Sequence, residues 1–532
     1  MNRPAAPIPR LFPATLAAPL GLAALVALAY LNSFAGTFLF DDIRFVKFFQ
    51  NAAFPPSLED IARAGLASRP FIALTFGLNQ ALFGSSLFGY HLVNLTLHVL
   101  AALALYGVVS RTPAPIRAES DQRWSGPAFG FLAAALWALH PIQTQAVTYI
   151  VQRCESAMGL FVFLALYCAL RGWRGARRTP WHLAALACFV LAAASKETAL
   201  ILPLALLGYD VVFFRKSPLA ALRESPVLYG GFLALAVLGS FALLDRLRGF
   251  YVDTTPIPLA DHLLAQSQTF FAYLKLVLWP AGLSFDHAWS PETGPLAWAC
   301  AAGTAAWLGL AGWLLWKRSR WGYLLAFFFL ALSPVTFFVN LDDAVADHRL
   351  YLPSAGICAL AASALALLPG PGKSAHRLAS PRLAVPVLLV ALLGAMTFAR
   401  NADYAAGELH LWMDVLRNKP GNRRANYVVA GLLAHTGRAA EAMPYLEQAL
   451  RPGGIANPAD YLLALNLYGE LLHNLGRVPE AIGAFQQALA LKPDSRETQV
   501  QLGHALNTAG RYEETIASLS VSVNNSTSSK PA

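Results

Sequence analysis

The chain has 532 residues, of which 56% are hydrophobic and only 13% are Asp, Glu, Lys or Arg, a composition too apolar for a water-soluble globular protein. The formal net charge of +10 is compatible with nucleic-acid binding, but the Lys and Arg residues cluster in short segments between apolar stretches rather than along one polar face. These features exclude a soluble nucleic-acid-binding protein and indicate a chain folded largely within a lipid bilayer.

Apolar stretches recur from the N-terminus to roughly residue 400. A stretch of about 17 to 25 apolar residues can cross a hydrocarbon core of about 30 Å as a helix. We therefore expect residues 1–400 to form an all-α membrane domain with about eleven spans. The expected spans are 12–33, 87–109, 126–141, 155–171, 181–195, 198–214, 227–245, 296–316, 321–339, 352–369 and 383–399.

Lys and Arg residues gather in five connections between these spans, namely 110–124, 171–180, 215–226, 317–320 and 370–382. All five lie on one side of the membrane provided that the apolar segment 261–282 does not cross, and the positive-inside rule makes that side cytoplasmic. We therefore expect 261–282 to lie in the outer interface or to re-enter, with Trp279 and Lys275 at headgroup depth. The other connections and the C-terminal domain then lie outside, in the periplasm if the Ala- and Leu-rich composition reflects a bacterial inner membrane.

Two adjacent acids, Asp41 and Asp42, follow the first span in an outer connection. Adjacent side chains cannot point the same way on a helix or strand, so one carboxylate can face a cavity while the other anchors the loop, for example by pairing with Arg44. A carboxylate placed beside an acceptor hydroxyl can take its proton as a general base. The alternative is a structural role, in which one of the two acids caps a helix that begins near Ile43.

Three cations on the otherwise base-poor outer side, Arg349, Lys196 and Arg153, are candidates for binding a phosphate group. Arginine can hold phosphate through two hydrogen bonds, whereas lysine acts as a point charge. A charge at membrane depth costs on the order of a few kcal/mol unless it is paired or faces water. Each cation therefore has a structural alternative, as an interfacial anchor or as the partner of a nearby acid: Asp347, Glu197 or Glu155.

His140 and His348 lie in the same outer connections and, with Glu197, can support proton transfer and charge balance. Interfacial histidines are nevertheless more often structural hydrogen-bonding residues. Asp342 and Asp343 form a short acidic pair without further ligands, which is more typical of a solvated loop than of a metal site. We expect no metal site, and the pattern leaves a requirement for a divalent metal open.

The segment 401–523 is polar and repetitive, with three similar stretches at 432–450, 471–489 and 505–523. Gly476 and Gly510 are separated by the 34-residue period of tetratricopeptide repeats, whereas Gly437 and Gly476 are 39 residues apart, which implies a short insertion. Each repeat is expected to contain two antiparallel helices joined at Gly-Arg, with alanines as the small packing residues.

Stacked helix pairs form a concave surface that suits an extended peptide. A spacer or an oligomerisation surface is the alternative role. The last residues, 524–532, have the composition of a disordered tail.

Several motifs occur in an order that resembles bacterial relatives of the transmembrane and tetratricopeptide-repeat-containing O-mannosyltransferases, in the GT-C glycosyltransferase superfamily. They are FAGTFLFDDIRFV (34–46), SRPFIALTFGLNQALFG with GYHLVNLTLHVL (68–100), HPIQTQAVTYIVQR (140–153), SKET (195–198), YLKLVLWPAGLSFDH (273–287) and ADHRLYLPS (346–354). The resemblance extends over nearly the whole chain.

This resemblance implies a GT-C-like membrane domain whose first outer loop carries the catalytic acids, here Asp41 and Asp42. It also implies a polyprenyl-phosphate-linked monosaccharide as donor and an inverting transfer to a protein Ser or Thr hydroxyl. The chain has few repeats and carries VQRCES (151–156) where the eukaryotic relatives usually have a glycine-containing turn. The identities of the sugar and of the acceptor therefore stay open.

Taken together, the sequence predicts an inverting glycosyltransferase with Arg349, Lys196 and Arg153 near the donor phosphate and the repeats presenting the acceptor. Its expected partners are membrane lipid, the lipid-linked donor and an acceptor protein or peptide, and not nucleic acid. No cofactor is expected apart from the donor. Two alternatives stay open: a transferase that modifies a surface glycan or lipid, and a non-enzymatic scaffold whose repeats recruit envelope-assembly factors.

Overall fold

The structure is a computed structural model, and it describes residues 14–52, 54–112, 126–215, 217–250, 258–287, 289, 291–336, 344–368, 381–451 and 458–516. All the regular structure in these ranges is helical, which confirms the expected all-α class. The described residues fall into two compact units. The first contains those before 284 and those from 291 to 408, and the second contains 284–287, 289 and those from 409 onward.

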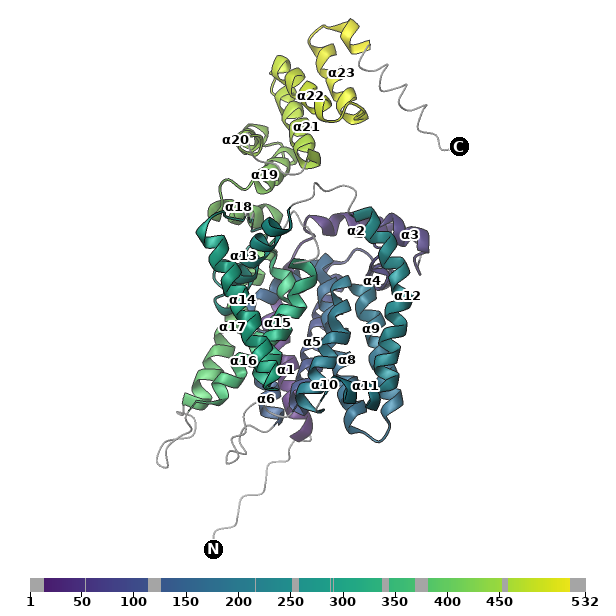
Figure 1. The fold of residues 1–532 in the computed structure, drawn as a ribbon. Coiled ribbons are helices and arrows are strands. Elements are labelled where there is room, and N and C mark those ends of the chain that lie inside the picture. Colours follow the sequence, from purple (N-terminus) through teal and green to yellow (C-terminus); the bar gives the residue numbers. More distant parts are fainter. Residues whose placement is uncertain are drawn as a thin grey trace. The chain divides into compact units, whose positions relative to one another are not determined.

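The first unit is a bundle of helices with several short 3₁₀ turns, labelled η (Figure 1). Its elements are α1 (Ala14–Ala29), η1 (Leu31–Ala35), α2 (Asp41–Gln50), α3 (Leu58–Arg63), α4 (Pro70–Phe83), α5 (Leu87–Arg111), α6 (Gly126–Ala138), η2 (Pro141–Gln143), α7 (Thr144–Thr148), η3 (Ile150–Gln152), α8 (Arg153–Arg174), α9 (Arg178–Ser195), η4 (Glu197–Ile201), α10 (Leu202–Phe213), α11 (Pro218–Glu224), α12 (Pro226–Phe250), α13 (Leu259–Leu278), α14 (Pro295–Trp316), α15 (Arg320–Thr336), η5 (Asp347–Leu350), α16 (Ser354–Ala366) and α17 (Pro381–Ala405).

Within the described residues, five helices are long and apolar enough to cross a membrane: Leu16–Ala35, Leu87–Arg111, Ile150–Arg174, Pro295–Trp316 and Leu383–Ala405. A sixth is added if the bent pair Glu197–Phe213 and Pro218–Glu224 counts as one span. The expectation of about eleven spans was therefore too high. The segment 261–282, expected not to cross, forms most of α13, which is not among the five.

The number of expected spans was too high because a helix can be apolar for two reasons: it faces lipid, or it packs inside the protein core. Helix α6, for example, has only 13 residues, or about 20 Å at 1.5 Å per residue. Most of its residues are buried within the bundle, and it ends at Ala138, shortly before η2 begins at Pro141. Helices α15 and α16 are likewise short apolar helices, of 17 and 13 residues.

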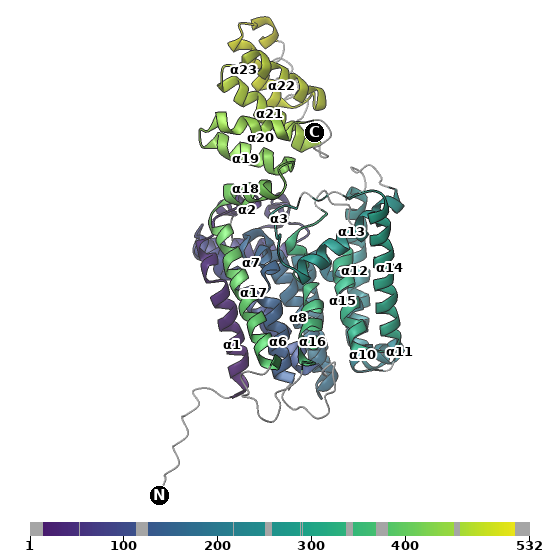
Figure 2. The ribbon, with the colours of Figure 1, turned by 90° about the vertical axis from the view of Figure 1, so that its left-hand side faces the viewer.

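The two ends of the bundle differ in charge. Helices α2 and α3 lie at one end and α11 lies at the other, in both views (Figures 1 and 2). Three of the basic connections meet at the α11 end, because Arg174 lies over the Phe214 ring at 5.2 Å and Arg320 lies over the Phe213 ring at 5.9 Å. We call this the basic end and the opposite one the acidic-loop end. Most of 110–124 and 370–382, the other two basic connections, lies outside the described residues.

The second unit consists of α18 (Glu408–Asn418), α19 (Arg423–His435), α20 (Ala439–Ala449), α21 (Pro458–Asn474), α22 (Val478–Leu491) and α23 (Arg496–Thr508). The turn glycines Gly437, Gly476 and Gly510 have φ angles of +77°, +77° and +74°, which glycine adopts at little cost. The alanines expected at packing positions, Ala442, Ala449, Ala481 and Ala488, are fully buried. Helix pairs joined at Gly-Arg are therefore confirmed.

A short segment from far upstream belongs to this second unit. The ring of Phe285 packs edge-on against Trp412 in α18, with centroids 5.1 Å apart. Asp286 forms an ion pair with Arg424 at 3.6 Å. The end of the YLKLVLWPAGLSFDH motif thus packs against the first helices of the repeat unit, a contact that the sequence did not indicate. The predicted tail, 524–532, lies outside the described residues.

Candidate active site at the acidic-loop end

The acidic motif lies at the start of an amphipathic helix. After η1 the chain runs extended to Phe40, whose φ of +37° is uncommon for a residue other than glycine. Helix α2 begins at the next residue, so Asp41 and Asp42 occupy its first turn, where the helix dipole favours negative charge. The N-cap position belongs to Phe40, and neither acid is the capping residue that the structural alternative required.

Asp42 is completely buried and holds two loops together. Its Oδ2 accepts a hydrogen bond from the backbone N–H of Leu39 at 3.1 Å, and its Oδ1 accepts one from the N–H of Val151 at 2.7 Å. Burial raises the pKa of Asp42 to about 8, although these two N–H groups act in the opposite direction. Asp42 therefore positions the acidic loop against η3.

Asp41 is exposed and lines a cavity of about 230 Å³. Its backbone N–H donates a hydrogen bond to the Tyr149 hydroxyl at 3.2 Å, which fixes the start of α2. The cavity is also lined by Arg44, Phe45, Leu66, Arg69, Ile72, Val151, Gln152 and Cys154. One of the two adjacent acids thus faces a cavity while the other anchors the loop.

Arg69 brings a second cation into this cavity, and it was not among the three cations predicted from the sequence. It precedes Pro70 at the start of α4, inside the motif SRPF. Its Nη2 and Nε donate to the two carboxylate oxygens of Glu197 at 3.0 and 3.4 Å. The side chain of Glu197 is about half exposed. Its partial burial would raise its pKa, but the charge and hydrogen bonds of Arg69 outweigh this effect and hold the pKa at about 2. A basic residue in an outer connection was the signal that could have identified Arg69.

Lys196 is buried and forms an ion pair with the buried carboxylate of Glu155. Of the three acids considered as partners for the cations, Glu155 is therefore the one that neutralises Lys196. Because both groups are withdrawn from water, each depends on the other for compensation. Lys196 lies beside Glu197 in the chain, which places this pair next to the Arg69 contact.

Arg153 is completely buried and is surrounded by protein groups. Its guanidinium lies 4.3 Å from the Phe76 ring centroid and 5.4 Å from that of Tyr90. Its Nε donates to the Asn94 Oδ1 at 3.0 Å. These contacts favour the structural alternative for Arg153, because a donor phosphate would have to displace them.

Arg349 and His348 lie in η5. The electrostatic surroundings of the His348 ring indicate which basic side chains lie near it. Burial, followed by the charges of Lys196, Arg349 and Arg69, holds the pKa of His348 well below its usual value. Its Nδ1 and its backbone N–H both bond to the Gln145 Oε1, at 2.9 and 2.8 Å. Lys196, Arg349 and Arg69 thus all lie within electrostatic reach of the His348 ring.

His140 has a structural set of contacts. Its Nδ1 accepts a hydrogen bond from the Ile142 N–H at 3.2 Å, so its Nε2 carries the proton and donates to the Val277 carbonyl at 2.9 Å. Both ring nitrogens are thus used in joining the start of η2 to α13. Arg44 is among the residues that line the cavity of Asp41.

The part of the chain that the structure describes contains no group of three or more His, Cys, Asp or Glu side chains arranged to hold a metal ion. The acidic pair at 342–343 lies outside the described residues.

The fold and this cavity define a multi-helix membrane protein with a polar site at one end of its bundle and a repeat unit attached.

A family model for the tetratricopeptide repeat matches residues 392–460, 454–496 and 469–523. The human protein O-mannosyl-transferase TMTC2 is 30% identical over 303 residues, which cover 50% of this chain and 34% of that protein. The Drosophila melanogaster protein O-mannosyl-transferase Tmtc3 is 28% identical over 499 residues, 80% of this chain and 52% of that protein.

The mouse protein O-mannosyl-transferase TMTC4 is 25% identical over 486 residues, which cover 79% of this chain and 64% of that protein. The chain thus spans about a third to two thirds of the length of these curated relatives. It is related to the family of transmembrane and tetratricopeptide-repeat-containing protein O-mannosyl-transferases, as the motifs predicted.

Proposed function

We propose that this chain is an inverting glycosyltransferase that moves a monosaccharide from a polyprenyl-phosphate carrier to a Ser or Thr hydroxyl of a protein. The observation that carries the proposal is the position of Asp41, exposed in a cavity that it shares with Arg44 and Arg69. The names of the relatives support a protein O-mannosyl-transferase activity and make mannose the first sugar to test.

The acceptor hydroxyl would approach the anomeric carbon with its proton directed at the Asp41 carboxylate. As the bond from the hydroxyl oxygen to C1 forms, the bond from C1 to the phosphate oxygen breaks, and the proton passes to Asp41. The bonding electrons leave with the polyprenyl phosphate. Positive charge at the cavity wall, from Arg69 and Arg44, would stabilise the developing phosphate charge.

Inversion follows from the number of carboxylates able to react. A retaining transfer needs a second carboxylate as nucleophile. Among the residues that line the cavity, Asp41 is the one that carries a carboxylate. A single base supports one displacement and hence inversion.

The lipid-linked donor would enter from the bilayer with its phosphate toward Arg69 and Arg349. The Arg69–Glu197 and Lys196–Glu155 contacts would hold the cationic wall in place. We propose that this cavity lies on the non-cytoplasmic side, and in a bacterium on the periplasmic face of the inner membrane, because three of the five basic connections meet at the opposite end of the bundle. The repeat unit would bind the acceptor protein.

The proposal is tested with the full chain in lipid nanodiscs, a synthetic polyprenyl-phosphate mannose and a set of Ser/Thr-rich peptides, with mass spectrometry as readout. We expect a mass gain of one hexose per modified site, and a loss of about a thousandfold or more in rate for Asp41→Asn. Glu59→Gln is the matched control, because Glu59 is an exposed acid of α3 that pairs with Arg63 and is not among the cavity-lining residues.

Unchanged transfer by Asp41→Asn would overturn the assignment of the base. If the peptides stay unmodified while an extracted glycolipid or glycan gains the hexose, the acceptor class is wrong and the transferase chemistry stands. If the Asp41→Asn variant fully restores the normal phenotype of a strain from which the gene for this chain has been deleted, the chain acts as a scaffold and the enzyme proposal fails.

A further inference from the structure

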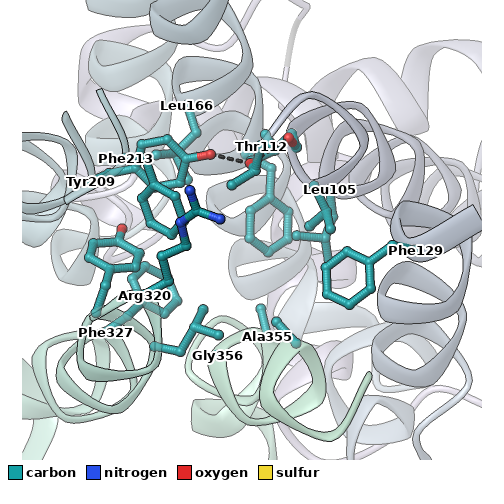
Figure 3. A pocket seen from close by; sticks show the side chains of 16 residues that line it. Leu105, Thr112, Phe129, Leu166, Tyr209, Phe213, Arg320, Phe327, Ala355 and Gly356 are labelled. Carbon is teal, nitrogen blue, oxygen red and sulfur yellow. Dashed lines mark hydrogen bonds between the residues drawn. The ribbon is translucent and has the colours of Figure 1, made fainter. Parts of the chain in front are cut away.

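A second cavity, of about 80 Å³, lies at the basic end of the bundle, away from the acidic loop. Side chains of α5, α6, α8, α10, α15 and α16 line it, and most of them are aliphatic or aromatic, as Figure 3 shows. Small residues of α16, Ala355, Gly356 and Ala359, form one wall. Several lining residues, including Thr112, Phe213 and Leu324, keep part of their surface exposed, so the cavity reaches the surface of the bundle.

The polar groups of this cavity are gathered on one side. The hydroxyls of Thr112 and Tyr209 are hydrogen-bonded to each other, and the side chain of Arg320 extends toward them (Figure 3). The Arg320 guanidinium lies 5.9 Å from the Phe213 ring centroid. Arg174, from the end of α8, also lies within electrostatic reach of Tyr209. The cavity thus combines an apolar interior with a cationic rim.

We propose that this cavity binds an anionic glycerophospholipid from the leaflet on the basic side of the membrane. Its phosphate would lie against Arg320, which can hold a phosphate group through two hydrogen bonds, with Arg174 adding positive charge. The first methylenes of one acyl chain would occupy the apolar interior. The volume of about 80 Å³ is roughly half that of an engineered apolar cavity of about 150 Å³ that binds benzene, so it fits only a short stretch of acyl chain.

Charge complementarity selects this occupant over a neutral lipid. Arg320 lines the cavity, and both Arg320 and Arg174 lie within electrostatic reach of the Tyr209 hydroxyl on its polar side. Basic residues next to a membrane surface attract anionic headgroups, and these two are the ones placed to act on a lipid in the cavity. The site is independent of the proposed transfer reaction, since its residues are different from those around Asp41.

The test is retention of lipid by the full chain, purified from nanodiscs of dioleoyl-phosphatidylglycerol and dioleoyl-phosphatidylcholine in equal amounts and analysed by native mass spectrometry. We expect phosphatidylglycerol to be retained over phosphatidylcholine. Arg320→Gln is expected to reduce this retention about fivefold, the effect of one cation at a membrane surface. Ala359→Phe, which fills the cavity, is expected to reduce it at least as much.

Arg318→Gln is the matched control, because it removes the same charge from the same connection at an exposed position that does not line the cavity. It is expected to retain phosphatidylglycerol as the unmodified chain does. Equal losses in Arg318→Gln and Arg320→Gln would show general attraction to the surface and overturn the site. Equal retention of both lipids would overturn the recognition of the phosphate group. Ala359→Phe is used only if its elution volume and helical content match those of the unmodified chain, and otherwise Ala355→Leu replaces it.

Discussion

Arg69 holds both carboxylate oxygens of Glu197, at 3.0 and 3.4 Å from its Nη2 and Nε, although the two residues are 128 positions apart. This contact joins the cavity of Asp41 to the SKET segment and to the buried Lys196–Glu155 pair. A planar guanidinium held in this way keeps a fixed orientation at the cavity wall, which suits the recognition of a phosphate group.

We predict that Arg69→Lys loses roughly a hundredfold in the rate of transfer per enzyme, the usual loss when one positioned donor to a developing negative charge is removed. Lysine keeps the charge but not the two-point contact with Glu197. Initial rates with saturating peptide measure the effect. Arg63→Lys is the control, since Arg63 is an exposed arginine of the neighbouring α3. Full activity of Arg69→Lys would rule out a positioned guanidinium.

We predict that Asp42→Ala destabilises the protein by about 1–3 kcal/mol for each backbone N–H group that it leaves unpaired, those of Leu39 and Val151. Thermal unfolding of the full chain in detergent measures this change. Asp41→Ala, at the exposed neighbouring position, is expected to leave the unfolding temperature nearly unchanged while it abolishes transfer. If Asp42→Ala abolishes transfer without lowering the unfolding temperature, and Asp41→Ala lowers the unfolding temperature without abolishing transfer, then Asp42 and not Asp41 is the base.

The pKa of Asp42 also predicts a dependence of stability on pH. Because burial raises this pKa to about 8, the folded state favours the protonated acid. The resulting stabilisation is complete below the ordinary carboxyl pKa of about 4 and is lost as the pH rises through 8. Unfolding temperatures measured between pH 5 and pH 9 are expected to fall more steeply for the unmodified chain than for Asp42→Asn. Parallel curves would show that Asp42 is ionised in the folded protein.

We predict that Lys196→Met destabilises the membrane unit by about 3–5 kcal/mol, because it leaves the buried Glu155 carboxylate without its partner. The double substitution Lys196→Met with Glu155→Gln is expected to recover most of this loss. The yield of monodisperse protein and its unfolding temperature provide the measurement. A double variant as unstable as the single one would show that the ion pair itself, and not the unpaired acid, decides stability here.

In the repeat unit, Gly476→Ala is expected to cost about 1–2 kcal/mol, because its φ of +77° is unfavourable for a residue with a side chain. Gly483→Ala is the matched control. Gly483 lies inside α22, and no atom lies within 4 Å of where its Cβ would be placed, so alanine is expected to stabilise that helix by roughly 0.5–1 kcal/mol. Hydrogen exchange of the amides in α21 and α22 of the full chain reports both changes. Equal protection of these amides from exchange in the two variants would contradict the left-handed conformation of Gly476 in the turn.

Local features were predictable because neighbouring residues encode them. The repeat period and the Gly-Arg steps predicted the helix pairs, and the left-handed conformation of Gly476 explains why glycine occurs there. The acidic pair was recognisable as a candidate site from its place after the first apolar stretch. The relationship to the O-mannosyl-transferases was also visible in short motifs along the chain.

Only the tertiary structure separated the roles of Asp41 and Asp42, brought Arg69 to the site and buried Arg153. Each of these depends on contacts between distant segments, such as the hydrogen bond from Val151 to Asp42 across 109 positions. The number of long apolar helices was decided in the same way. Hydropathy along the chain cannot tell an apolar helix that faces lipid from one, such as α6, that packs inside the bundle, since both are removed from water.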